Sequence, residues 1–205
     1  MRKSCENGRS MVEMLGVLAI IGVLSVGGIA GYSKAMFKHK MNQTLDMISN
    51  AVARMTELYN GNNSGTSGVE ALKAIGVYPE DCVPADYDPY GSCELSVAEN
   101  GRIGIEFGSD WGHIVIHIEG REARDVCVAF FSSGMYKNVP DDWWYPNGYI
   151  AVDSTLLYSK SPEAIANGAK SEITSADIAD ACAICADTSY GGPPMCRIYW
   201  HIKRL

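Results

Sequence analysis

The amino-acid sequence predicts an α+β protein in which a long N-terminal α-helix carries an antiparallel β-sheet head domain with flanking helices and disulfides. Three observations support this fold class. An apolar run extends from Met11 to Ala30, its continuation is striped with apolar residues at helical spacing, and alternating strand patterns follow among helical ones. At 205 residues, 47% hydrophobic and 20% charged, the chain can bury one ordinary core beside this helix.

The apolar run is long enough to cross a membrane. As a helix rising 1.5 Å per residue it spans about 30 Å, the thickness of a hydrocarbon core. Between Arg9 and Lys34 the only charged side chain is Glu13. Two simpler interpretations stay open. A cleaved secretory signal usually has a shorter apolar core of about 7 to 15 residues, and an ordinary single-pass anchor accounts for the length but not for the acid.

Beyond Tyr32 the predicted helix becomes amphipathic. No proline occurs between Ser10 and Leu58, so one helix can run through both halves. Apolar residues recur at steps of four and three, and we expect this stripe to pack against the domain that follows. The stripe consists of Met41, Leu45, Ile48, Val52, Met55 and Tyr59.

The placement of the cysteines predicts an exported, oxidised domain. Of the seven cysteines, Cys5 lies before the apolar run and the other six lie beyond it. An even number of cysteines after a membrane segment is typical of disulfides in an oxidising compartment. The N-terminus would then lie in the cytoplasm. Six cysteines can pair in many ways, and sequence alone does not resolve them. We predict the pairs Cys82–Cys93, Cys127–Cys182 and Cys185–Cys196.

The remaining sequence predicts the elements of a head domain. A Pro- and Asp-rich loop is expected over residues 79–92. One predicted strand alternates cleanly, with three isoleucines on one face and His113, Val115, His117 and Glu119 on the other. We expect helices over 69–76, 121–131 and 175–186, and strands over 101–107, 113–119, 147–158 and 196–203.

Three clusters allow a functional interpretation beside a structural one. Two histidines and an acid on the strand 113–119 could imitate a metal site, but side chains two apart on a strand merely share a face. The loop 79–92 could offer calcium oxygens, yet it lacks the pattern of a known calcium loop. Aromatic residues at 143–149 could anchor the core, contact other subunits or serve adhesion. The residues concerned are His113, His117 and Glu119; Asp81, Asp86 and Asp88; and Trp143, Trp144, Tyr145 and Tyr149.

Composition argues against several function classes. The net charge of -7 and the absence of a basic cluster exclude a phosphate-tracking surface, so we expect no nucleic-acid partner. The sequence has no glycine-rich phosphate loop, no nucleophile elbow and no convincing pair of catalytic acids. We therefore expect no enzyme activity, no cofactor and no metal.

The stretch "GRSMVEMLGVLAIIGVLSVGGIAGYSKA" (8–35) resembles the N-terminus of type IV pilins and of type II secretion pseudopilins. It is most similar to the type IVb branch, which includes the thin-pilus pilins. In this resemblance Gly8 is the last residue of the leader, Arg9 is the first mature residue and Glu13 is the fifth. It implies a leader over 1–8, a long helix over 9–58 with a transmembrane and assembly segment at 11–31, and a globular head over 59–205.

The resemblance implies a structural subunit. A prepilin would insert in the bacterial inner membrane, be cleaved after Gly8 by prepilin peptidase, and polymerise into an extracellular pilus for adhesion, conjugation or secretion. Its partners would be identical or related subunits, the assembly machinery and the membrane. Glu13 of a docking subunit would meet the amine at Arg9 of its neighbour. The alternative is a membrane-tethered exported domain that never polymerises, a binding or thiol-redox module using Cys182 and Cys185. A tether has no use for Glu13.

Overall fold

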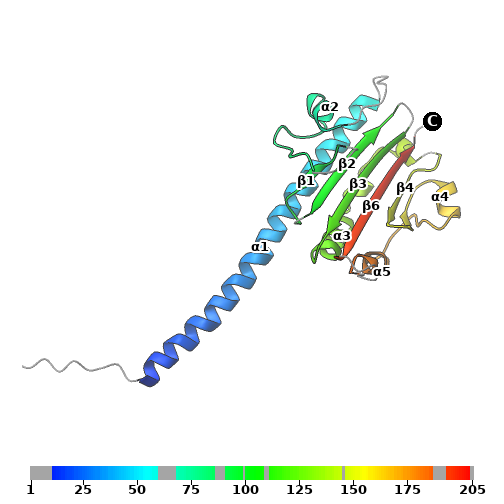
Figure 1. The fold of residues 1–205 in the computed structure, drawn as a ribbon. Helices are drawn as coiled ribbons and strands as arrows, with labels where there is room; N and C mark the ends of the chain where they lie inside the picture. Colours follow the sequence, from blue (N-terminus) through cyan, green and yellow to red (C-terminus); the bar gives the residue numbers. More distant parts are fainter. Residues whose placement is uncertain are drawn as a thin grey trace, which may run out of the picture. The chain divides into compact units, whose positions relative to one another are not determined.

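The computed structural model describes residues 11–59, 68–85, 91–98, 100–108, 111–144, 146–186 and 193–203. These residues form an α+β fold with one long N-terminal helix, a six-stranded sheet and shorter helices (Figure 1). The predicted fold class is confirmed. The chain divides into two compact units between His39 and Lys40.

The long helix, α1, runs from Met11 to Tyr59 without interruption. From Lys40 onward it belongs to the same compact unit as the sheet. Most of the predicted apolar stripe is buried there, and Ser49 Oγ lies 3.4 Å from Met135 Sδ, so this half of the helix contacts the rest of the head. The buried side chains of α1 are Met41, Thr44, Ile48, Ala51, Val52 and Met55, while Leu45 is half-buried. The side chain of Tyr59 lies outside the described residues.

The sheet is antiparallel throughout, in the order β1-β2-β3-β6-β4-β5. Strand β6, which comes last in the sequence, therefore lies between β3 and β4 in the middle of the sheet (Figure 1). The strands are β1 (Cys93–Leu95), β2 (Gly101–Phe107), β3 (Trp111–Glu119), β4 (Tyr149–Val152), β5 (Thr155–Tyr158) and β6 (Met195–Lys203).

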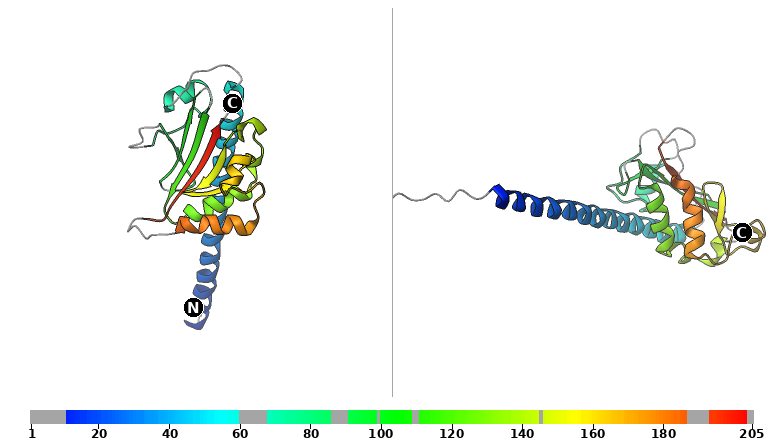
Figure 2. Two further views of the ribbon diagram at one scale, coloured as in Figure 1. Left: turned by 90° about the vertical axis from the view of Figure 1, so that its right-hand side faces the viewer. Right: turned by 90° about the horizontal axis from the view of Figure 1, so that it is seen from below.

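Short helices connect and flank the strands. The positive φ of 73° at Gly76 follows the end of α2, a conformation that glycine adopts without strain. A capping box starts α5, because Thr174 Oγ1 accepts a hydrogen bond from Asp177 N and Asp177 Oδ2 accepts one from Thr174 N. Helices α3 and α5 lie side by side (Figure 2). The helices are α2 (Val69–Ala74), α3 (Ala123–Ser132), α4 (Pro162–Ala166) and α5 (Ser175–Ala183), with 3₁₀-helices η1 (Met135–Lys137), η2 (Asp141–Trp144) and η3 (Ile184–Ala186).

One face of the sheet forms the core. Ile114, Ile116 and Ile118 are buried as the alternation in β3 predicts. The ring of Trp200 on β6 lies 6.5 Å from that of Phe130 in α3, measured between centroids. This face of the sheet therefore packs against the helical layer, and the opposite face carries the polar residues of the alternation.

The segment 147–158 differs from its prediction as a single strand. It forms two strands, β4 and β5, which pair as a hairpin. The turn places Asp153 at a φ of 50°. Aspartate tolerates this left-handed region better than most residues, because its short polar side chain can bond locally. The turn was missed because no glycine marks it.

Most of the aromatic residues at 143–149 that the structure describes belong to the hydrophobic core. Trp143 and Trp144 are both buried, and the ring of Trp144 lies 5.2 Å from that of Tyr158 on β5 and 6.4 Å from that of Trp200 on β6. Burial contradicts an adhesive role for these two tryptophans, because their rings fill the space beside the sheet. Tyr149 is half-buried, and Tyr145 lies outside the described residues.

Candidate functional site in the N-terminal helix and the head domain

The first half of α1 presents an exposed apolar surface. Its large apolar side chains between Met11 and Tyr32 that lie among the described residues are 53–81% exposed. The helix from Glu13 onward is long and apolar enough to cross a membrane, with a mean hydropathy of 2.2 in its most apolar window and none of that window buried. A membrane anchor and a signal sequence both meet this description.

Glu13 is the only charged residue of this surface. It lies in the first turn of α1 and is exposed. The positive end of the helix dipole favours an acid at this position, typically by about 0.3 to 1 kcal/mol. The helix dipole alone therefore stabilises a carboxylate at this position only modestly. The predicted processing residues Gly8 and Arg9 lie outside the described residues, so the proposed pair between Glu13 and a terminal amine stays a prediction.

The six cysteines beyond α1 form three disulfides in the pairs predicted from the sequence. Their Cα atoms are 5.6 Å apart in Cys82–Cys93, 5.8 Å in Cys127–Cys182 and 4.5 Å in Cys185–Cys196. Cys182 and Cys185, although two residues separate them, bond to different partners, and all four sulfur-bearing residues of these two bridges are fully buried. This arrangement offers no accessible Cys-x-x-Cys pair, which removes the support for a thiol-redox module.

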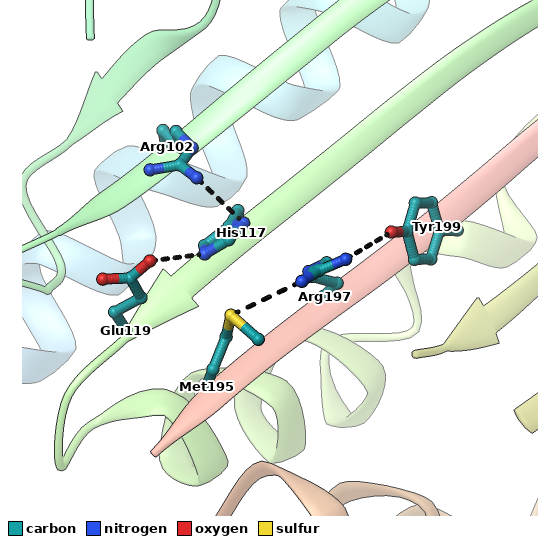
Figure 3. Close-up of polar contacts among 6 residues, drawn as sticks. All are labelled: Arg102, His117, Glu119, Met195, Arg197 and Tyr199. Atoms are coloured by element: carbon teal, nitrogen blue, oxygen red, sulfur yellow. Dashed lines mark hydrogen bonds and ion pairs between the residues drawn. The ribbon is translucent and has the colours of Figure 1, made fainter. Parts of the chain in front are cut away.

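The face of the sheet opposite the helical layer carries a polar cluster around His117 (Figure 3). Arg102 Nη2 lies 3.2 Å from His117 Nδ1, and His117 Nε2 lies 2.9 Å from Glu119 Oε1. Because a guanidinium can only donate, Nδ1 accepts and the proton resides on Nε2, which donates to Glu119. Burial, reinforced by the charge of Arg102, lowers the pKa of His117 below 6.5. The predicted His117–Glu119 proximity is therefore a hydrogen bond within the sheet.

A row of rings crosses the same face from β3 to β4. The His113 ring lies 5.3 Å from that of Trp111 and 4.6 Å from that of His201, and Tyr149 lies 5.1 Å from His201, all between centroids. His113 Nε2 and His201 Nδ1 are 2.5 Å apart, so one imidazole donates to the other. Burial lowers the pKa of His113. Sequence reasoning missed His201, although the alternation in 196–203 could have placed it on this face.

An apolar, exposed N-terminal helix joins a disulfide-linked antiparallel sheet in one chain. The architecture is pilin-like. No family model matches the chain, and neither the curated proteins nor the solved structures yield a match. The pilin-like description therefore rests on the fold itself.

A groove of about 1350 Å³ lies between the second half of α1 and the segment that carries the Cys82–Cys93 bridge. Five carboxylates and two guanidinium groups line it, so its lining is net acidic. Of the three aspartates considered for calcium, Asp81 lines this groove, whereas Asp86 and Asp88 lie outside the described residues. The charged residues along the groove are Asp46, Arg54, Glu57, Asp81, Glu94, Arg102 and Glu119.

Proposed function

We propose that this chain is a type IV pilin-like structural subunit. It enters the inner membrane as a prepilin with its N-terminus in the cytoplasm, is cleaved after Gly8, and polymerises into an extracellular filament. The proposal rests on one observation: the exposed apolar half of α1 carries a single carboxylate, Glu13, in its first turn. As a structural subunit, the chain is proposed to have no enzymatic activity.

The energetics of Glu13 support assembly over simple anchoring. A charged side chain at the centre of a membrane helix costs about 2.5 to 3.5 kcal/mol or more, and the helix dipole offsets only about 0.3 to 1 kcal/mol of such a cost for a lone anchor. The amine that cleavage creates at Arg9 is a cation at the matching end of an identical helix. A docking subunit that brings its Glu13 to the amine of a neighbour compensates both charges. The pair would then fix the axial register of packed helices that are otherwise featureless and apolar.

The small residues of the apolar half support close packing between such helices. Apart from the chain neighbours and the helix's own backbone, no heavy atom lies within 4 Å of a Cβ added at any of its glycines. Glycines allow helix backbones to approach closely in an apolar environment, where packing rather than hydrophobic burial drives association. The glycines are Gly16, Gly22, Gly27, Gly28 and Gly31.

The decisive experiment replaces Glu13 by alanine in cells that make the filament. Membrane insertion and head folding should persist, because the change removes a charge that is costly in the lone subunit. Docking should then leave the amine of the neighbour buried and unpaired. Breaking one partner of a buried pair costs about 3 to 5 kcal/mol, so filament yield should fall at least about a hundredfold. Electron microscopy of sheared filaments measures the yield, and the intact mass of their subunit should begin at Arg9.

Two matched variants separate assembly from local helix effects. Ser25→Ala should assemble nearly normally, because the Ser25 hydroxyl only donates to Ile21 O of its own helix, at 2.7 Å. The exchange Glu13→Met with Met14→Glu keeps the composition and leaves an acid in the first turn. It moves the carboxylate by about 100° around the helix. If the helix dipole were the whole reason for the acid, this exchange would assemble as wild type does.

Three results would contradict the proposal. If Glu13→Ala forms normal homopolymeric filaments, assembly does not depend on the ion pair. If the mature subunit retains Met1, processing after Gly8 is excluded. A wild-type chain that is anchored and exported but never found in a filament would favour the non-polymerising tether.

A further inference from the structure

The groove beside the second half of α1 carries negative charge that the head does not neutralise. Three of its five carboxylates, Asp46, Asp81 and Glu94, are exposed. Among the described residues, none of these three forms an ion pair. The other two, Glu57 and Glu119, are paired with side chains of the head itself. The groove therefore presents three unpaired acids to its surroundings.

The Cys82–Cys93 bridge holds two of these acids on the wall of the groove that faces α1. Asp81 precedes Cys82 and Glu94 follows Cys93, and the Cα atoms of the two cysteines are 5.6 Å apart. At about 3.8 Å per peptide step, the Cα atoms of Asp81 and Glu94 are at most about 13 Å apart. A hydrogen bond of 2.8 Å from Glu94 N to Val83 O ties the same segment together. The bridge thus keeps two like charges near each other, and a cation between them lowers their repulsion.

The same chain presents the complementary charge earlier in α1. Lys34 and Lys38 are both exposed, and their spacing of four residues places them on one face of the helix. Neither lysine forms an ion pair with any residue that the structure describes. The sequence between Glu13 and Asp46 contains no acid, and Lys40 adds a third lysine to this stretch. This part of the helix is therefore basic.

We propose that the groove of one subunit binds the Lys34 and Lys38 face of α1 in a second copy of this chain. The inference takes its partner from the proposed function, in which identical chains assemble. Charge complementarity supports that partner, because every copy supplies three unpaired carboxylates in the groove and two unpaired ammonium groups on the helix. The sizes agree as well. A helix about 10 Å across occupies about 420 Å³ per turn, and the groove measures about 1350 Å³.

The contact is heterologous, because neither lysine lines the groove. One copy can therefore give its lysine face to one neighbour and accept the lysine face of another. Repetition of such a head-to-tail contact produces a ring if the rotation closes and an open helical filament if it does not. Complementary charges of this kind also fix which surfaces meet, more than they add to affinity.

The test reverses the charge of each surface in the full chain and measures filament yield by electron microscopy. The lysine variant is Lys34→Glu with Lys38→Glu, and the groove variant is Asp46→Lys with Asp81→Lys. Each variant alone should lower the yield at least about tenfold, because like charges placed opposite each other oppose association. Coexpression of the two variants should restore the yield. Each groove then meets the oppositely charged helix face of the other variant.

A matched control changes the net charge equally outside the groove. Glu172 and Asp180 are exposed and do not line it, so Glu172→Lys with Asp180→Lys should assemble as the wild type does. The restored yield on coexpression also shows that both reversed variants fold. If the lysine variant assembles normally, or if coexpression restores nothing while the control assembles, the groove contact is overturned.

Copurification of two differently tagged full chains from detergent separates this inference from the proposed function. The wild-type chains should associate at low salt and separate in about 1 M salt, where charges are screened within about 3 Å. Glu13→Ala should associate in the same way, because Glu13 does not line the groove. If this association occurs and reverses with charge although cells make no filament, the groove contact is supported and the filament proposal fails. If filaments form but charge reversal changes neither filament yield nor association, the groove contact alone fails.

Discussion

Removal of the Cys127–Cys182 bridge should destabilise the head more than removal of Cys82–Cys93. The first bridge closes 55 residues and the second closes 11. At 25 °C the loop-entropy relation gives about 4.2 kcal/mol for the longer loop and about 2.8 kcal/mol for the shorter one. The difference of about 1.4 kcal/mol corresponds to a tenfold difference in the equilibrium between folded and unfolded chains.

The free energy of unfolding is measured by urea titration of the full chain in detergent. The two variants are Cys127→Ala with Cys182→Ala and Cys82→Ala with Cys93→Ala. Tryptophan fluorescence reports on the head alone, because all four tryptophans of the chain lie in it. Peptide mapping should first establish that the two remaining bridges of each variant pair as in the wild type. A loss of unfolding free energy that is equal for the two variants, or larger for Cys82→Ala with Cys93→Ala, would refute the reasoning from loop length.

Two further predictions concern packing and protonation in the head. Ile48→Ala, which empties a fully buried position on α1, should lower the free energy of unfolding by about 2 to 5 kcal/mol in urea titrations, whereas the exposed Asn42→Ala should stay within about 0.5 kcal/mol. Burial holds the pKa of His113 and His117 below 6.5, so the unfolded chain binds protons first and the head should lose stability as the pH falls below 6.5. Replacing both by glutamine should flatten that pH dependence, and replacing the exposed His39 should not; a dependence unchanged by the double replacement would contradict this assignment.

Local patterns predicted much of the fold because they are set by neighbours in the sequence. The period of two in 113–119 correctly assigned the buried isoleucines, and helical spacing located most of the buried stripe of α1. Strand β1 escaped prediction because three residues are too few to establish a period. The β4–β5 hairpin escaped because its turn depends on Asp153 rather than on glycine.

The candidate sites depend more on tertiary structure. Glu13 stands out in the sequence alone, since a single charge in an apolar run is visible without a fold. The pairing of His113 with His201 joins residues 88 apart, and only strand order brings them together. The closeness of Cys127 to Cys185 and Cys196 likewise comes from the packing of α3, η3 and β6. The pairing was predicted from the loop, helices and strand that the bridges would join, and that reasoning did not show that two bridges lie against each other.

The central position of β6 has a consequence for the order of events during synthesis. Strands β1 to β3 form one half of the sheet and β4 with β5 the other, and both halves pair only with β6 at their junction. The ribosome makes β6 after every other strand, so the two halves have no common partner until residues 195–203 have emerged. The head therefore completes its sheet only after every other strand has been made. Until then, the strands on either side of β6 cannot join into one sheet.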